Sequence, residues 1–203
     1  MSDSHDPPSV SVLVVDDERG LADLYTAWLS DSYDVTTAYS GTEALAKINT
    51  SIDVVFLDRR MPKLSGDAVL SGIRENGYDC YVAMLTAVTP DFDIIDLALD
   101  YYLLKPVSQC DLHRTIERFL DWEEYNECLQ ELCSLVATRA ALAAEKSEEE
   151  LQANPAYRQL VAEIESLQTE VDEFATAITE DEFGMLSRAI EDNRSGVDAD
   201  CTK

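Results

Sequence analysis

The sequence has few of the side chains that build zinc sites. Its 203 residues include two histidines, His5 and His113, and five cysteines, none of which form a C-x-x-C pair. A structural zinc site needs about four clustered nitrogen or sulfur ligands. This pattern therefore argues against a zinc centre and favours free thiols in a reducing compartment.

Long apolar runs are also missing. No stretch approaches the roughly 18 to 20 apolar residues that a membrane-spanning helix requires. Residues 1–9 lack the basic and then apolar order of a secretion signal. We therefore expect a cytoplasmic protein without a membrane segment, and a disordered N-terminus over residues 1–9.

Basic residues are scarce. The chain has 15 lysines and arginines against 41 acids, which gives a formal net charge of −26. The acids are spread over both halves of the chain, so the imbalance is a property of the whole surface and not of a binding tail. Such a surface repels itself in dilute buffer and is screened in concentrated salt. The composition therefore predicts adaptation to a high-salt cytoplasm.

Over the first 107 residues, short apolar runs rich in β-branched residues alternate with helical patterns. The predicted strands are 10–15, 35–38, 54–57, 81–85 and 101–104, and the predicted helices are 19–30, 41–49, 66–75, 91–98 and 108–121. This alternation predicts an α/β fold with a doubly wound parallel sheet. The first, third and fourth strands are almost continuously apolar, which is typical of strands covered on both faces.

The pattern changes after Pro106. No proline or glycine occurs between Val107 and Ala153, and Ser108 with Asp111 predicts a helix cap. The helix that begins there is expected to run on toward Lys146, with a kink or boundary near residues 121–123, where the apolar spacing changes.

A second long helix is predicted after a polar connector over residues 147–153. Asn154 and Pro155 read as its N-cap and first-turn proline. Apolar residues then recur at alternating steps of three and four: Tyr157, Leu160, Ile164, Leu167, Val171, Phe174 and Ile178. This seam predicts a helical hairpin or coiled coil. The polar residues 184–203 are expected to form a disordered tail.

Polar side chains stand at the ends of four predicted strands. Asp16 and Asp17 follow the first strand, Asp58 the third, Thr86 the fourth and Lys105 the fifth. A lone Asp-Asp pair indicates little in so acidic a chain, but the carboxyl ends of parallel strands converge on one crevice. Clustered carboxylates repel one another unless a hard cation lies among them, and oxygen ligands suit Mg²⁺. One carboxylate is then available to attack phosphorus.

Over about residues 10–120 the chain resembles the receiver domains of two-component response regulators. The matching motifs are VLVVDDE at 12–18, DRRMP at 58–62, TA at 86–87 and YLLKP at 102–106. The resemblance implies a flavodoxin-like receiver domain over residues 10–121, with five parallel strands in the order 2-1-3-4-5.

The resemblance also implies a metal and phosphorylation site. Asp58 would be the phosphoacceptor and a ligand of Mg²⁺. Asp17 would bind the metal directly, Asp16 would help through water, and Arg60 would contribute its backbone carbonyl.

Other matching positions would respond to the phosphoryl group. Lys105 would pair with it, and Thr86 and Tyr102 would form a switch pair in which the hydroxyl moves toward the phosphate while the ring turns inward. The structural positions implied are Pro106, after a cis peptide bond, Pro62 and Gly66.

Residues from about 124 to 185, with AALAAEK at 140–146, resemble the HalX region of receivers from halophilic archaea. We expect a phosphorelay response regulator, not an enzyme, that takes a phosphoryl group from a histidine kinase. Its output is expected through residues 122–183, as a homodimer or with a helical protein partner.

A DNA-binding transcriptional regulator is the alternative output. Residues 123–203 carry 20 acids and 6 bases and show no basic stripe, which disfavours phosphate contacts. An effector enzyme is disfavoured further, because this region contains no histidine or metal constellation.

Overall fold

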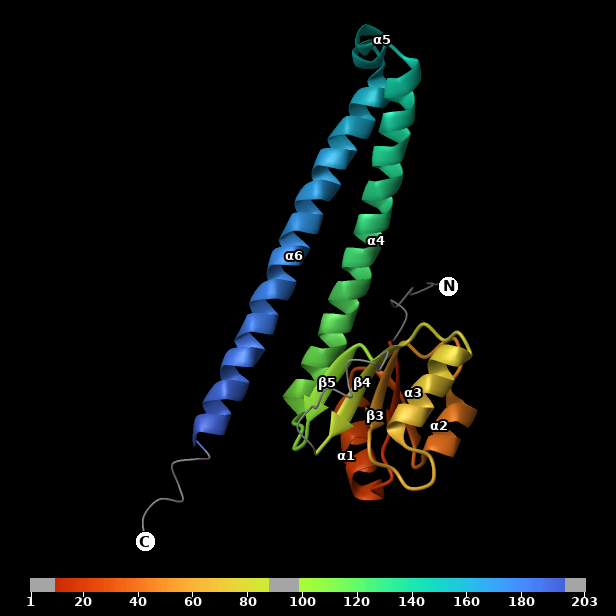
Figure 1. The fold of residues 1–203 in the computed structure, drawn as a ribbon, viewed down its shortest axis with the longest axis vertical. Coiled ribbons are helices and arrows are strands. Elements are labelled where there is room, and N and C mark those ends of the chain that lie inside the picture. The colour runs from red at the N-terminus through yellow and green to blue at the C-terminus, as the bar shows by residue number, and fades with distance from the viewer. Residues whose placement is uncertain (1–9, 88–98, 196–203) are drawn as a thin grey trace, which may run out of the picture. The chain divides into compact units, whose positions relative to one another are not determined.

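The computed structural model describes residues 10–87 and 99–195, with side chains up to Thr176 (Figure 1). The chain divides into two compact units after Phe119, here called the N-terminal unit and the helical unit. The predicted N-terminal disorder over residues 1–9 and the predicted helix over 91–98 lie outside the described residues.

The N-terminal unit contains one parallel sheet. Its strands are β1 (Ser11–Val15), β2 (Asp34–Ala38), β3 (Val54–Asp58), β4 (Tyr81–Thr86) and β5 (Tyr101–Leu104). Their order is β2-β1-β3-β4-β5, which confirms the predicted topology. The register pairs Val15 with Leu57 and Asp58 with Leu85, so β1, β3 and β4 end at the same edge of the sheet.

Helices cover both faces of this sheet. The helices between the strands are α1 (Arg19–Leu29), α2 (Gly41–Lys47) and α3 (Gly66–Glu75). Side chains of α2 and α3 form one hydrophobic cluster with every second residue of β1, β3 and β4. Every residue of β3 is buried, as its continuous apolar run predicted.

A long helix, α4 (Gln109–Glu145), follows β5 and runs past the boundary between the two units. It begins with the predicted cap: the Ser108 amide donates to Asp111 Oδ2 at 2.8 Å, and the Asp111 amide donates to Ser108 Oγ at 3.3 Å. Its first turns pack on the sheet through Leu112, Ile116 and Phe119, all fully buried. The predicted continuation toward Lys146 is confirmed, and the helix is not interrupted near residues 121–123, where a kink or boundary was expected.

The helical unit consists of the rest of α4 with α5 (Glu148–Ala153) and α6 (Pro155–Ser195). The segment expected to be a polar connector is instead the short helix α5. Ser147 and Glu150 form a capping box at its start, and Leu151 is buried. The capping hydrogen bonds and the burial of Leu151 stabilise this helix, although its acidic sequence is typical of a solvated connector.

Helix α6 begins as predicted. The Ala156 amide donates to Asn154 Oδ1 at 2.9 Å, and Pro155 is the first helical residue. The helix continues to Ser195, so the part of the predicted tail before residue 196 is helical, because strong helix formers such as Met185 and Leu186 follow Gly184. Residues 196–203 lie outside the described residues.

Within the helical unit, α4 and α6 run antiparallel and are joined by α5 (Figure 1). Ile164 and Leu167 of the predicted seam are buried, whereas Tyr157, Leu160 and Val171 are half-buried. The side chain of Ile178 lies outside the described residues. Among the described helices, none combines the length and apolarity needed to cross a membrane.

Candidate functional site

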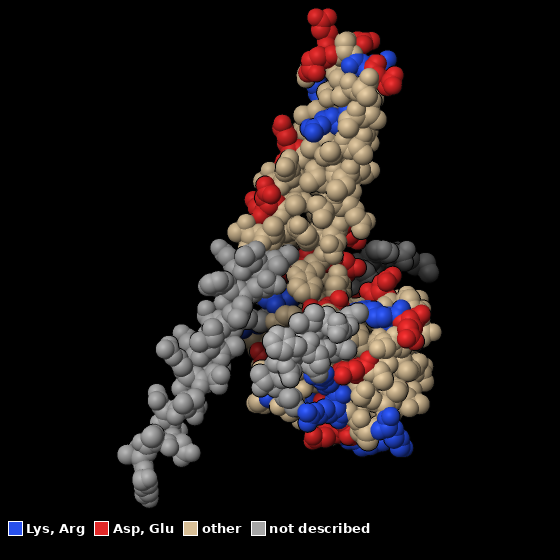
Figure 2. All heavy atoms as spheres, viewed as in Figure 1, with Lys and Arg blue, Asp and Glu red and all other residues tan. Residues whose placement is uncertain are grey.

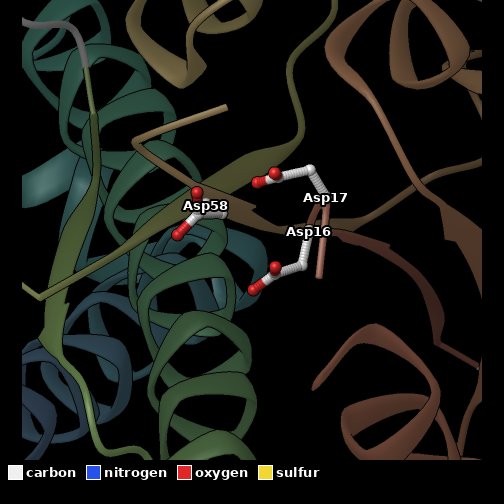
Figure 3. A group of neighbouring side chains, drawn as sticks. All are labelled: Asp16, Asp17 and Asp58. Carbon is white, nitrogen blue, oxygen red and sulfur yellow. The ribbon is translucent and has the colours of Figure 1, made fainter. Parts of the chain in front are cut away.

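Three carboxylates meet at the carboxyl edge of the sheet. Asp16 and Asp17 directly follow β1, and Asp58 is the last residue of the neighbouring strand β3 (Figure 3). One oxygen of each carboxylate lies within 4.8 Å of the others. Asp16 and Asp58 are buried, while Asp17 is more exposed. The shared end of β1 and β3 therefore brings together the three acids that the sequence predicted.

Lys105 supplies the positive charge of this cluster. Its ammonium donates to Asp16 Oδ2 at 2.7 Å and to Asp58 Oδ1 at 2.6 Å. Its backbone amide donates to the Thr86 carbonyl at 2.7 Å, which extends the pairing of β5 with β4 to Lys105. The peptide bond to Pro106 is cis. One cation is thus shared between two buried anions, and the three acids are only partly neutralised.

The pKa values reflect this balance. Burial raises the pKa of the Asp58 carboxyl, an effect larger than the lowering by its hydrogen bond and charge interaction with Lys105. Burial lowers the pKa of Lys105, but its hydrogen bonds to Asp16 and Asp58 outweigh burial and leave the pKa raised. Burial therefore disfavours the charged form of Asp58, and a further cation nearby would favour that form.

Gly66 allows the chain to turn closely around Asp58. A Cβ at this position would lie 2.4 Å from the Asp58 carbonyl oxygen and 2.8 Å from Arg59 Cα. The Gly66 amide donates to the Arg59 carbonyl at 2.9 Å, and the Arg59 amide donates to Leu85 O at 2.9 Å. Any side chain at Gly66 would push the backbone of the Asp58 segment away from α3.

The other predicted residues occupy neighbouring positions. Thr86 ends β4 and is buried, and Tyr102 of β5 pairs in register with Met84 and packs beside the cluster formed with α2 and α3. Arg60 is exposed, and its backbone hydrogen bond to Asp58 lowers the pKa of that carboxyl. Pro62 is exposed in the loop that follows β3.

Two features were missed by sequence reasoning. The Arg59 guanidinium pairs with Asp67 of α3 at 3.1 Å, beside the Asp58 backbone. Tyr25 of α1 is buried, and burial raises its pKa, with Lys105, Asp16 and Asp58 among the charges that act on it. The helical spacing of Ala22, Tyr25 and Leu29 was a readable sign of burial, but the nearness of Tyr25 to the acids depends on the tertiary fold.

Family models match both parts of the chain. Residues 12–117 match the response regulator receiver domain, and residues 110–187 match the HalX domain. The two matches overlap in the first turns of α4, the helix that the two units share.

The chain is similar to curated proteins over part of their length. A candidate transcriptional regulator of Haloferax volcanii is 44% identical over 160 residues, which cover 78% of this chain and 27% of that protein. The transcriptional regulatory protein DltR of Streptococcus agalactiae is 38% identical over 106 residues, covering 50% of this chain and 47% of DltR. The chain thus spans less than half the length of these two relatives.

Solved structures resemble the N-terminal unit. A response regulator receiver domain protein of Clostridium thermocellum has a TM-score of 0.52 and 31% identity, covering 57% of this chain and 97% of that chain. The chemotaxis protein CheY4 of Vibrio cholerae has a TM-score of 0.51 and 29% identity, covering 55% of this chain and 98% of its own.

Proposed function

Because this chain belongs to the response regulator receiver family and carries a HalX domain, we propose that it is a cytoplasmic phosphorelay protein that accepts a phosphoryl group on Asp58 from a histidine kinase. The observation that carries the proposal is the shared ion pair at the end of β3. Asp58 and Asp16 both accept from Lys105 within 2.7 Å, and an oxygen of Asp17 lies within 4.8 Å of theirs.

The proposed reaction is a phosphoryl transfer between two side chains. A carboxylate oxygen of Asp58 forms a bond to phosphorus as the bond from phosphorus to the kinase histidine breaks. The imidazole leaves with the electron pair of that bond and takes up a proton from water. Lys105 pairs with a phosphoryl oxygen, and the Thr86 hydroxyl donates a hydrogen bond to the attached group. The chain's role is to position and to accept, and no substrate is turned over.

The residues present fit a magnesium ion. The site offers one carboxylate oxygen each from Asp16, Asp17 and Asp58. Oxygen atoms of this kind are the ligands that Mg²⁺ prefers. Asp17, Asp58 and the carbonyl of Arg60 would hold the ion, with Asp16 assisting. Bound there, it would offset the negative charge of the incoming phosphoryl oxygens.

Phosphorylation would change the charge beside Thr86 and Tyr102. The phosphoryl group adds roughly −1.5 to −2 charges and three acceptor oxygens. Thr86 is the last residue of β4 and pairs in register with Leu104, and Tyr102 is half-buried in the neighbouring strand β5. We propose that these two residues form the switch: they change conformation when Asp58 is phosphorylated and so alter β5.

The test is labelling of Asp58. Asp58→Asn removes the nucleophilic oxygen and is expected to abolish phosphoryl transfer from a cognate kinase in the presence of Mg²⁺. The matched control is Asp31→Asn, an exposed acid outside the cluster, which is expected to label at the wild-type rate. Labelling is followed by mobility on a phosphate-binding gel. Retained labelling of the Asp58→Asn protein would move the acceptor to another residue.

We assign the output to the helical unit, through binding of a protein partner or a second copy of the chain. Val136 and Leu142 of α4 are more than a third exposed, and much of the seam on α6 is half-buried. On the face shown in Figure 2, acidic and basic side chains both gather around α5, and the surface of the helices below it is mostly uncharged, with a few charged side chains. Exposed apolar side chains such as Val136 and Leu142 suit contact with a partner helix.

DNA binding is the second candidate, favoured by the transcriptional names of the two relatives. The 20 acids and 6 bases of residues 123–203 oppose it. The two outputs are separated by capturing phosphorylated full-length chain from a high-salt lysate and comparing bound protein with bound DNA. Light scattering of the purified protein, with and without phosphorylation, then tests for a second copy.

A further inference from the structure

Three aromatic rings and a buried arginine lie together on the face of the sheet that α4 covers. This aromatic cluster consists of Tyr81, Tyr101, Arg118 and Phe119. The Phe119 ring stacks on Tyr81 with centroids 4.8 Å apart and meets the Tyr101 ring edge-on at 6.3 Å. The Arg118 guanidinium carbon lies 4.8 Å from the centre of the Tyr101 ring. Arg118 is 6% exposed, so this cation–π contact is largely shielded from water.

The cluster joins α4 to the strand that carries the proposed switch residue. Tyr101 and Tyr102 are consecutive in β5, so their side chains point to opposite faces of the sheet. Tyr102 packs beside the cluster formed with α2 and α3, while Tyr101 contacts Arg118 and Phe119 of α4. One peptide unit therefore separates the two rings on opposite faces of the sheet.

The position of the cluster along α4 matters equally. Arg118 and Phe119 are the last residues of the N-terminal unit, and α4 continues without interruption to Glu145 in the helical unit. Consecutive hydrogen bonds along a helix make it a stiff element. The same uninterrupted helix therefore carries Arg118 and the first residues of the helical unit. Burying the charge of an arginine at this junction costs free energy unless the charge interacts with a partner. The Tyr101 ring provides such a partner through the cation–π contact.

We propose that the aromatic cluster couples β5 to the helical unit, with Tyr101 and Arg118 as the positioning residues that transmit the phosphorylation state of Asp58. The inference rests on the proposed function, because it concerns the consequence of modifying that site. In this coupling, reorientation of the Tyr102 ring changes the position of the Tyr101 ring on the opposite face of β5. The cation–π contact with Arg118 then changes, and this biases α4 between two arrangements.

The test measures amide hydrogen exchange over residues 120–145 in the full-length protein with Mg²⁺, before and after addition of beryllofluoride as a phosphoryl analogue. For the wild type we expect the exchange rates to change by at least about fivefold, the lower end of usual allosteric coupling. Tyr101→Leu removes the ring and Arg118→Met removes the charge, and each is expected to reduce this change below about twofold. The conservative variants Tyr101→Phe and Arg118→Lys are expected to restore most of it.

Phosphorylation of Asp58 is measured on the same proteins, together with urea unfolding before activation. The coupling is supported if a variant is folded and phosphorylated at the wild-type rate but its exchange over residues 120–145 no longer responds to beryllofluoride. The coupling is overturned, and the phosphoacceptor role left intact, if a folded variant responds to beryllofluoride as the wild type does. If Tyr101→Leu unfolds, Arg118→Met and Arg118→Lys decide alone. Failure of the wild type to be phosphorylated would instead overturn the proposed function and this inference with it.

Discussion

The two units of this chain bury their side chains very differently. In the N-terminal unit, β1, β3 and β4 are buried almost throughout, and helices cover the sheet on both faces. In the helical unit, Leu151, Ile164 and Leu167 are the buried apolar side chains among those described up to Thr176. The N-terminal core buries Asp16 and Asp58, two acids of the proposed phosphoacceptor site. The few buried side chains of the helical unit leave apolar residues exposed, and these could contact another molecule in the proposed output.

The largest expected effect breaks the ion pair in the N-terminal core. Lys105→Met would leave Asp16 and Asp58 as buried anions without their shared cation, at a cost of about 3 kcal/mol of unfolding free energy near neutral pH. Exposed Lys63→Met is the control and is expected to change little. Urea unfolding measures both, and equal stability of the two variants would show that the pair does not stabilise the fold.

The cost of Lys105→Met should depend on pH in a defined direction. The pKa of Asp58 is raised in the folded protein, so its contribution to stability is fully present below its unfolded pKa and is lost as the pH rises through the folded pKa. Removing Lys105 raises this pKa further, because the lowering interactions disappear. The difference in unfolding free energy between variant and wild type should therefore shrink as the solution is acidified.

The second expected effect probes the few buried side chains of the helical unit. Leu167→Ala removes one of these side chains and is expected to cost about 2 to 3 kcal/mol. Val136→Ala, on an exposed position of α4, is expected to cost less than about 1 kcal/mol. Chemical unfolding followed by helical circular dichroism compares them. A loss for Val136→Ala as large as that for Leu167→Ala would indicate that another copy covers Val136 in solution.

The third effect is local to α5. Ser147→Ala removes the capping box and is expected to destabilise this helix by about 1 kcal/mol. Amide exchange should rise over residues 148–153 and stay unchanged in the N-terminal unit. Ser134→Ala, an exposed serine in the middle of α4, is the matched control. A uniform rise of exchange in both units would contradict their separation after Phe119.

The smallest expected effect is the salt dependence of stability, which both units should share. The acids are spread over the whole chain, so raising KCl from about 0.1 M to 2 M, which reduces the screening length from about 10 Å to below 3 Å, is expected to stabilise each unit. Exchange measured at the two salt concentrations resolves the units. Stabilisation confined to one of them would mean that specific ion pairs, and not the net charge, carry the salt response.

Much of the candidate site could be predicted because parallel strands end together. Asp16, Asp17, Asp58, Thr86 and Lys105 each follow or end an apolar run, and such ends converge in a doubly wound sheet. The helix α5 escaped notice although its signal, a serine followed three residues later by a glutamate, was present in the sequence. Its run of acids resembled a solvated linker, and the burial of Leu151 depends on the neighbouring helices.

The sequence by itself determined the order of the five strands and the two long helices, the seam on α6, the acidic surface and the residue types of the site, because these follow from local periodicity and composition. Tertiary structure alone decided which distant groups meet. Lys105 reaches two carboxylates from strands other than its own, Gly66 lies against the Asp58 carbonyl, and Arg118 is buried over Tyr101. Periodicity indicates which face a side chain takes, but its partner depends on how separate elements pack.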